Sequence, residues 1–135
     1  MSGEKPGVVV ELAWQGGFRF EARAGDTTLV VDSERRAGLS PTQALAVGLA
    51  GCMAIDIVDI LQKGRFALDG MHVRFAGERR AEPPRRFTRI ALHFVVSGNV
   101  PADRVERAIE LSRERYCSVW HSLRPDIELH TSFEV

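Results

Sequence analysis

The segment Pro41–Lys63 constrains the fold of this chain more than any other feature of its sequence. Ser40 is a favourable N-cap residue, and Pro41 suits the first helical position because its missing N–H would have no helical partner there. Gly64 follows as a typical C-terminal stop. The sequence therefore predicts one long helix, about 35 Å in length at 1.5 Å per residue, which is close to the width of a small domain.

This predicted helix is apolar nearly all the way round. Between Leu45 and Leu61 its only clearly polar side chains are Asp56 and Asp59. A helix of this kind is normally buried on every side, whereas a single sheet can cover only one side of it. We therefore expect a symmetric homodimer that packs the remaining apolar face against a second copy.

Strand patterns lie on both sides of the helix. Apolar and polar residues alternate with period two, and short links rich in glycine or proline separate the runs. The predicted strands are residues 8–14, 18–24 and 27–32 before the helix, and 69–77, 86–97 and 127–135 after it; shorter helices are predicted at 101–116 and 119–123. The order βββαββααβ groups strands in blocks, so the fold class is α+β, and 135 residues fit a single domain, 1–135.

Composition excludes several function classes. Eighteen basic residues balance eighteen acidic ones, so bulk charge favours neither nucleic acid nor an anionic membrane as a partner. No charge-free apolar run reaches the about 18 to 20 residues that span a bilayer, and residues 1–7 have no apolar secretion core. Two cysteines are too few for a disulfide framework. We expect a cytoplasmic protein with no membrane partner.

Cys52 lies in the middle of the long helix, after Gly48 and Gly51. Each glycine lowers helix propensity by about 1 kcal/mol relative to alanine, so the pair suggests close approach of another backbone. Asp56 and Asp59 share a stripe with Cys52 and would raise its pKa, so a reactive Cys52 needs a positive charge or hydrogen bonds from elsewhere. The alternative is that Cys52 is only a small buried side chain.

Cys117 lies between the two predicted C-terminal helices. If the second of these begins at Ser118, the cysteine occupies its N-terminal end, where amide donors favour a thiolate. Arg113, Arg115 and His121 add positive charge nearby. A cysteine that merely closes a helix corner is an equal alternative.

Metal and phosphate sites are not expected. No pair of potential ligands has the CxxC, HxxxH or HExxH spacing, and three of the four histidines fall on the outward phase of their strands: His72, His93 and His130. The arginines at the tip between the strand patterns 69–77 and 86–97 are interspersed with glutamates, which favours a solvated hairpin tip over a phosphate site: Arg79, Arg80, Arg85, Arg86 and Arg89.

Two motifs together resemble the OsmC/Ohr family of thiol peroxidases. The first runs from Ser40-Pro41 through Gly-Leu-Ala-Gly-Cys52-Met-Ala-Ile-Asp56, and the second is Tyr-Cys117-Ser-Val. The likeness extends over essentially the whole chain, and the Gly-Cys and Ala-Ile-Asp features are similar to the less characterised OsmC-like branch. It implies an intertwined homodimer with two antiparallel sheets around paired central helices and active sites at the subunit interface.

The resemblance also implies an activity in oxidative stress defence: cofactor-free, peroxiredoxin-like reduction of organic hydroperoxides. Cys52 matches the peroxidatic cysteine, which becomes a sulfenic acid, and Cys117 matches the resolving cysteine, which forms a disulfide with it. A dithiol or lipoylated protein would restore both thiols.

One part of the family pattern differs here. Family peroxidases carry a glutamate shortly after the helix-starting proline, and this glutamate orients an arginine that activates the cysteine. Gln43 stands near that position, and Arg35 and Arg36 are the candidates for the arginine. The rival function is a non-catalytic dimeric binding protein that holds an apolar ligand on the same scaffold, with both cysteines structural.

Overall fold

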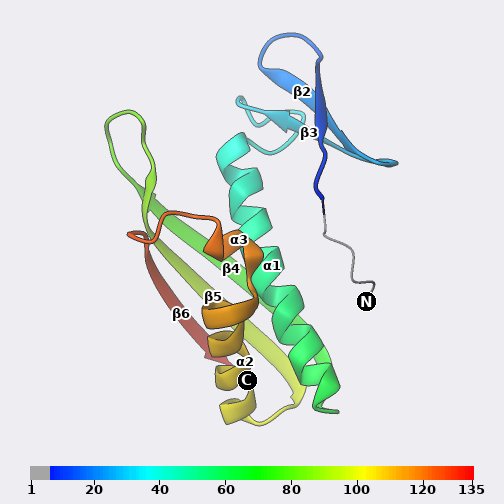
Figure 1. The fold of residues 1–135 in the computed structure, drawn as a ribbon, viewed down its shortest axis with the longest axis vertical. Coiled ribbons are helices and arrows are strands. Elements are labelled where there is room, and N and C mark those ends of the chain that lie inside the picture. The colour runs from blue at the N-terminus through cyan, green and yellow to red at the C-terminus, as the bar shows by residue number, and fades with distance from the viewer. Residues whose placement is uncertain (1–6) are drawn as a thin grey trace. The chain divides into compact units, whose positions relative to one another are not determined.

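The computed structural model describes residues 7–135, which form two compact units, one ending at Leu45 and one comprising Ala46–Val135 (Figure 1). Each unit contains a three-stranded sheet of its own. Residues 1–6, on which most of the expectation about a secretion segment rests, lie outside the described residues. The expectation of a single domain, 1–135, stays a prediction.

The N-terminal unit is an antiparallel sheet of three sequential strands, as predicted. Strands β1 (Glu11–Trp14), β2 (Arg19–Ala24) and β3 (Thr27–Asp32) pair in that order. The indole Nε1–H of Trp14 donates to the carbonyl oxygen of Gly17 at 2.9 Å, which closes the turn between β1 and β2. Gly16 and Gly17 both have positive φ there, a conformation that glycine adopts without strain.

Asp32 holds the loop that leads from β3 to the long helix. Its buried carboxylate accepts hydrogen bonds from the backbone N–H groups of Ala37 at 3.0 Å, Glu34 at 2.9 Å and Arg36 at 3.3 Å. These hydrogen bonds, led by that from Ala37, outweigh burial and hold the pKa of Asp32 below its ordinary value. The loop that carries Arg36 is therefore fixed by one carboxylate.

Helix α1 spans Pro41–Lys63, the predicted bounds. Ser40 and Gln43 form a capping box at its start: the Gln43 N–H donates to Ser40 Oγ at 3.1 Å, and the Ser40 N–H donates to Gln43 Oε1 at 2.9 Å. At the other end Lys63 pairs with Asp59 at 3.0 Å.

The C-terminal unit contains a mixed sheet. Strands β4 (Ala67–Arg79) and β5 (Phe87–Asn99) are antiparallel, and β6 (Glu128–Glu134) lies parallel to β5. The α+β class and the order of elements are confirmed, but the expectation of two antiparallel sheets is wrong for this one. The chain crosses over between β5 and β6 through helices, and such a connection allows parallel pairing.

Three helical segments make this crossover: α2 (Ala102–Leu111), the π-helix η1 (Ser112–Tyr116) and α3 (Ser118–His121). The predicted helix 101–116 therefore changes from α to π geometry over its last five residues. The predicted helix 119–123 starts one residue earlier and is shorter.

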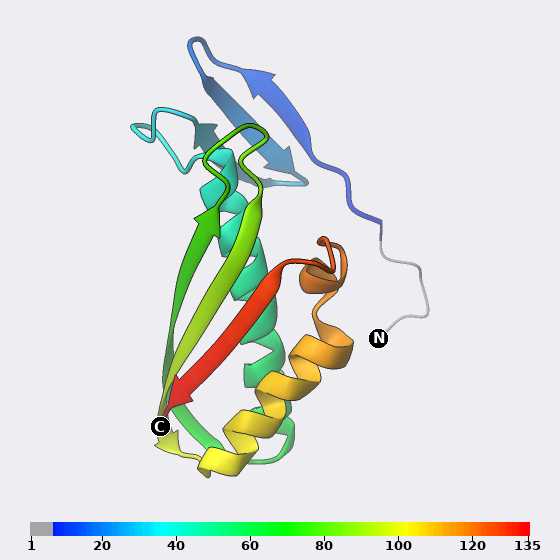
Figure 2. The ribbon, with the colours of Figure 1, turned by 90° about the vertical axis from the view of Figure 1, so that its left-hand side faces the viewer.

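Helices α1 and α2 cover the same face of the C-terminal sheet and form the core with it (Figure 2). The buried side chains of α1 recur every four residues, and those of β5 recur every two; they are Leu49, Met53, Ile57 and Leu61, and Ile90, Leu92, Phe94 and Val96. Within the described chain the opposite side of α1 is open, with Val47 58% and Ile55 70% exposed. The sheet therefore covers one side of the helix, as expected.

By length and composition α1 is apolar enough to cross a membrane, with a mean hydropathy of 2.1 over its best 18-residue window, even though Asp56 and Asp59 lie within the helix. Core helices of soluble proteins meet the same criterion. The four buried side chains of α1 pack into the core beneath the sheet, so this helix is a core helix of the described chain.

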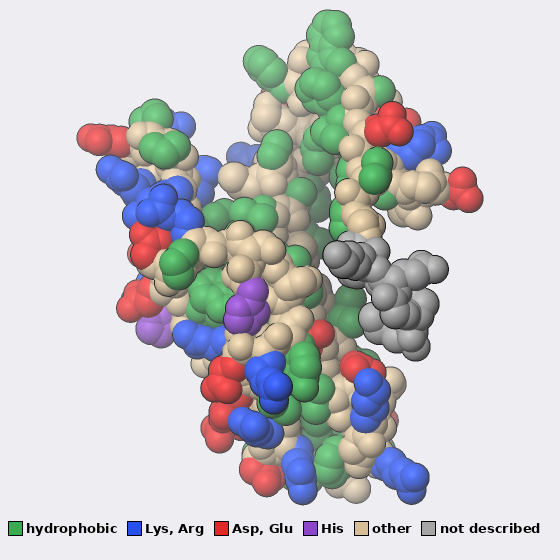
Figure 3. Space-filling view, viewed as in Figure 1, with side chains coloured by type: hydrophobic (Ala, Val, Ile, Leu, Met, Phe, Trp, Pro, Cys, Tyr) green, Lys and Arg blue, Asp and Glu red, His purple; other side chains and the backbone are tan. Residues whose placement is uncertain are grey.

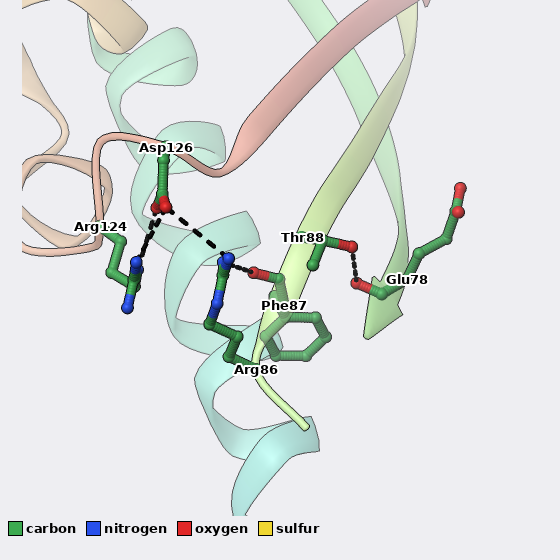
Figure 4. Close-up of polar contacts among 6 residues, drawn as sticks. All are labelled: Glu78, Arg86, Phe87, Thr88, Arg124 and Asp126. Carbon is green, nitrogen blue, oxygen red and sulfur yellow. Dashed lines mark hydrogen bonds and ion pairs between the residues drawn. The ribbon is translucent and has the colours of Figure 1, made fainter. Parts of the chain in front are cut away.

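The tip of the β4–β5 hairpin is tied to the segment before β6 (Figure 4). The Arg124 guanidinium donates two hydrogen bonds to the Asp126 carboxylate, both at 2.9 Å, and Arg86 forms an ion pair with the same carboxylate at 3.7 Å. The Thr88 hydroxyl donates to the Glu78 carbonyl oxygen at 3.3 Å. Two arginines of the predicted tip thus pair with acidic side chains, Arg86 with Asp126 and Arg89 with Glu78 and Glu128, and residues 80–85 are exposed, in keeping with the predicted solvated tip.

Candidate functional site

The π-helix positions Cys117 beside α1. The backbone N–H of Cys117 donates to the carbonyl oxygen of Ser112 at 2.8 Å, a bond across five residues that defines the wider π turn. Such turns are frequent at functional sites. In this protein the turn leaves Ser112 and Cys117 completely buried.

Three chemically versatile side chains meet between α1 and this turn. One ligand atom from each of Cys52, Asp56 and Cys117 lies within 4.8 Å of the other two. Both cysteines are free thiols, Cys52 half-buried and Cys117 buried. The structure therefore brings together the two cysteines whose proximity the sequence alone could not show.

Ser112 anchors the carboxylate of this cluster. Its hydroxyl donates to Asp56 Oδ2 at 2.8 Å. Sequence reasoning had missed Ser112, although a serine in the otherwise apolar stripe of Val105, Ala108 and Ile109 was a signal for it. Ser118, also missed, places its Oγ 3.9 Å from Cys52 Sγ.

The two thiols have opposite pKa shifts. Partial burial raises the pKa of Cys52, but hydrogen bonds from the Val119 backbone and from the Cys117 and Ser118 side chains outweigh burial, so the pKa of Cys52 lies below its ordinary value. The hydrogen bonds that a reactive Cys52 was expected to need are thus present. They counter the nearby Asp56 carboxylate, which raises the pKa.

Cys117 differs from the expectation of a favoured thiolate. It does occupy the N-cap of α3 and accepts a hydrogen bond from the Trp120 N–H at 3.3 Å. However, burial dominates and, with the neighbouring Cys52 and Asp56, raises the pKa of Cys117 to about 11. Complete desolvation outweighs a single amide donor here.

The other predicted residues lie outside the cluster of Cys52, Asp56 and Cys117. Gln43 is in the first turn of α1, where its side-chain oxygen caps the helix, and Arg36 lies in the loop held by Asp32. Asp59 pairs with Lys63 instead of joining Asp56.

The two glycines of the helical motif do not contact another backbone within the described chain. A Cβ added at Gly48 or Gly51 would meet nothing within 4 Å. The expected close approach is therefore not made by this chain, because the face that carries these glycines is not covered by its own sheet.

The cluster can do two kinds of chemistry. Two thiols at this distance can cycle between dithiol and disulfide. Two thiolates and a carboxylate are also a donor set that thiophilic divalent cations accept. The common ligand-spacing motifs do not include this set, because only Cys52 and Asp56 share a helix and Cys117 lies far from them in the sequence.

Comparisons with known proteins agree on one family. A sequence profile of the family described as OsmC-like protein matches residues 32–132. Protein YhfA of Escherichia coli (strain K12) is 40% identical over 127 residues, which cover 92% of this chain and 95% of that protein.

Solved structures show the same fold. A hypothetical protein from Aquifex aeolicus VF5 has a TM-score of 0.90 at 28% identity and covers 97% of each chain. An organic hydroperoxide resistance protein from Legionella pneumophila has a TM-score of 0.71 at 20% identity, covering 96% of this chain and 98% of that one.

Proposed function

This chain belongs to the OsmC-like protein family, as its motifs indicated, and from that membership we propose that it is a thiol-dependent peroxidase for organic hydroperoxides. The observation that carries the proposal is the meeting of Cys52 and Cys117, with a lowered pKa on the more exposed thiol and a raised pKa on the buried one. That division matches a nucleophile and a resolving thiol.

In the first step the Cys52 thiolate attacks the distal oxygen of the hydroperoxide. An S–O bond forms, the O–O bond breaks, and the alkoxide takes a proton from solvent and leaves as an alcohol. Sulfur is oxidised by two electrons to a sulfenic acid and the peroxide is reduced. Cys52 is partly buried against the apolar core, as are Val119, whose backbone donates to it, and Trp120, and such apolar surroundings suit an alkyl substituent.

In the second step the Cys117 sulfur attacks the sulfenic sulfur of Cys52. The S–S bond forms, the S–O bond breaks, and hydroxide leaves with the Cys117 proton as water. An external dithiol, small or lipoylated, then reduces the disulfide by exchange. Burial of Cys117 suits this role because it protects the second thiol from direct oxidation.

We further propose a cytoplasmic homodimer. Exposed apolar side chains support it on both units: Val47 and Ile55 on α1, and Leu12, Trp14 and Phe18 in and next to the N-terminal sheet, where hydrophobic side chains are visible in Figure 3. Gly48 and Gly51 leave room on α1 for close approach of a partner backbone.

Gln43 and Arg36 are proposed to assist Cys52 by analogy with the family. Because Gln43 already caps α1 through its side-chain oxygen, a glutamate there would keep the same hydrogen bond. Gln43→Glu is therefore expected to fold normally, and a sharp rise in its peroxidase rate would show that the carboxylate had been limiting. Loss of that gain in Gln43→Glu/Arg36→Ala would assign the arginine.

The central test uses one equivalent of cumene hydroperoxide on the reduced protein, followed by peptide mapping by mass spectrometry. A disulfide between Cys52 and Cys117 is expected. Cys117→Ser should stop at a Cys52 sulfenic acid that dimedone traps, and Cys52→Ser should not react. A folded wild-type protein that leaves the peroxide unconsumed with dithiothreitol or dihydrolipoamide would refute the proposal.

A second candidate is the non-catalytic binding protein for an apolar ligand. A groove of about 460 Å³ between α1 and β4 favours it; the groove is lined by Ala54, Ile55, Val58, Asp59, Gln62, Met71 and Val73. Saturable binding of a fluorescent fatty acid, lost in Val58→Arg, together with unreactive thiols, would select this function over the peroxidase.

A further inference from the structure

The cluster of Cys52, Asp56 and Cys117 has the composition of a three-ligand site for a thiophilic cation. Zinc accepts thiolate sulfur at about 2.3 Å and carboxylate oxygen at about 2.1 Å, often with three protein ligands and one open position. The three donors already lie within 4.8 Å of one another, so only a small contraction would bring them to tetrahedral spacing.

The surroundings hold these donors as a metal site requires. Ser112 donates to Asp56 Oδ2 at 2.8 Å and so orients the carboxylate from behind. The Trp120 N–H donates to Cys117 Sγ at 3.3 Å and stabilises sulfur as an anion. Partners of this kind, outside the ligands themselves, fix ligand geometry and tune affinity.

The charges around the thiols favour a cation. The Asp56 carboxylate lies beside both sulfurs, with all three ligand atoms within 4.8 Å of one another, and the hydrogen-bond donor that holds this carboxylate is the neutral Ser112 hydroxyl. A fully reduced, deprotonated site would carry two thiolates and a carboxylate without compensation. A divalent cation supplies the missing positive charge and displaces the thiol protons as it binds.

We propose that the reduced protein binds one thiophilic divalent cation, such as Zn²⁺, through Cys52 Sγ, Cys117 Sγ and one Asp56 carboxylate oxygen. The half-buried Cys52, next to the exposed Ser118, provides the entry side. A Cys52–Cys117 disulfide would consume both sulfur ligands, so binding is confined to the reduced state. The inference uses residues of the proposed peroxidase but does not depend on that activity.

The test is a titration of chelator-treated, reduced protein with Zn²⁺ against a chromophoric chelator, repeated with Co²⁺ to observe sulfur-to-cobalt charge-transfer absorption. One ion per chain with proton release is expected. Asp56→Asn should weaken affinity at least about 10-fold, because changing only the hydrogen-bond partner of a ligand already costs about 10- to 100-fold. Asp59→Asn is the matched control, since Asp59 lies on the same helix but pairs with Lys63, and it should bind as the wild type does.

A measurement that needs no variant uses the wild-type protein oxidised to the disulfide, which should not bind. Absence of saturable Zn²⁺ binding at micromolar concentration would overturn the inference. So would equal affinity in Asp56→Asn and the wild type, or binding that survives the disulfide. Because absorption and not turnover is measured, an inactive protein that binds Zn²⁺ refutes only the peroxidase, and an active one that does not bind refutes only the metal site.

Discussion

The hydrogen bond between Ser112 and Asp56 gives a quantitative test of how the site is held. Ser112 is completely buried and donates at 2.8 Å to a carboxylate. A hydrogen bond to a charged group contributes about 1.5–3 kcal/mol, so Ser112→Ala should lower the free energy of unfolding by about 2 kcal/mol, or about 30-fold in the equilibrium constant. For a chain of this size the melting temperature should fall by about 6 °C.

The assay is urea unfolding of reduced, chelator-treated protein at one fixed protein concentration, because the stability of an oligomer depends on concentration. Asp56→Ala and the double variant complete a double-mutant cycle. A coupling energy of about 1.5–2 kcal/mol is expected, since Asp56→Ala leaves the buried Ser112 hydroxyl without its partner and Ser112→Ala leaves the partly buried Asp56 carboxylate without its donor.

Ser122→Ala is the control. Its hydroxyl also makes a short hydrogen bond, donating to the Ser118 carbonyl oxygen at 2.7 Å, but at an exposed position. Its loss should change stability by less than about 0.5 kcal/mol. If Ser112→Ala behaves like Ser122→Ala, and its effect adds simply to that of Asp56→Ala, the reasoning about the buried anchor is refuted.

Three further predictions concern reactivity, assembly and titration. Iodoacetamide should modify Cys52 well before Cys117, which is buried and has its pKa raised to about 11; equal rates in peptide mapping would contradict this. Ile55→Glu should shift the mass measured by light scattering from dimer to monomer, and an unchanged dimer would exclude this face of α1 from the interface. Arg124 lowers the pKa of the Asp126 carboxyl from 3.8 to about 2, so their ion pair should persist below pH 3.8 and be lost only near pH 2. Carboxyl NMR should show the pKa of Asp126 returning toward 3.8 in Arg124→Ala.

Local signals made the long helix predictable to the residue. Ser40 and Pro41 at its start are chemically distinctive, and their effects need no tertiary contact. Gly64 does follow the last helical residue as expected, but the left-handed φ that ends the helix is at Arg65. The parallel pairing of β6 was not predictable in the same way. Alternation with period two is the same for parallel and antiparallel neighbours, so the sequence of β6 does not reveal its direction.

The candidate site was half predictable. Cys52 and Asp56 share a helix, so their proximity follows from a spacing of one turn. Cys117 joins them only through tertiary packing and a π turn, and Ser112 resembles any helical serine in the sequence. The thiolate alternative for Cys117, one of two left open, fails for a related reason: burial is a property of the folded unit, whereas the position at a helix start is local.

The π turn at Ser112–Tyr116 brings together two residues that an α-helix would separate: Ser112, which holds Asp56, and Cys117, which lies beside Cys52. In an α-helix, residues five positions apart point about 140° away from each other, since each residue turns the chain by about 100°. The π turn places the N–H of Cys117 on the carbonyl oxygen of Ser112 and stacks the two residues along one side. Deleting a single residue from this turn would restore an α-helical path, and the serine that steadies Asp56 could then no longer face α1 together with the thiol that meets Cys52.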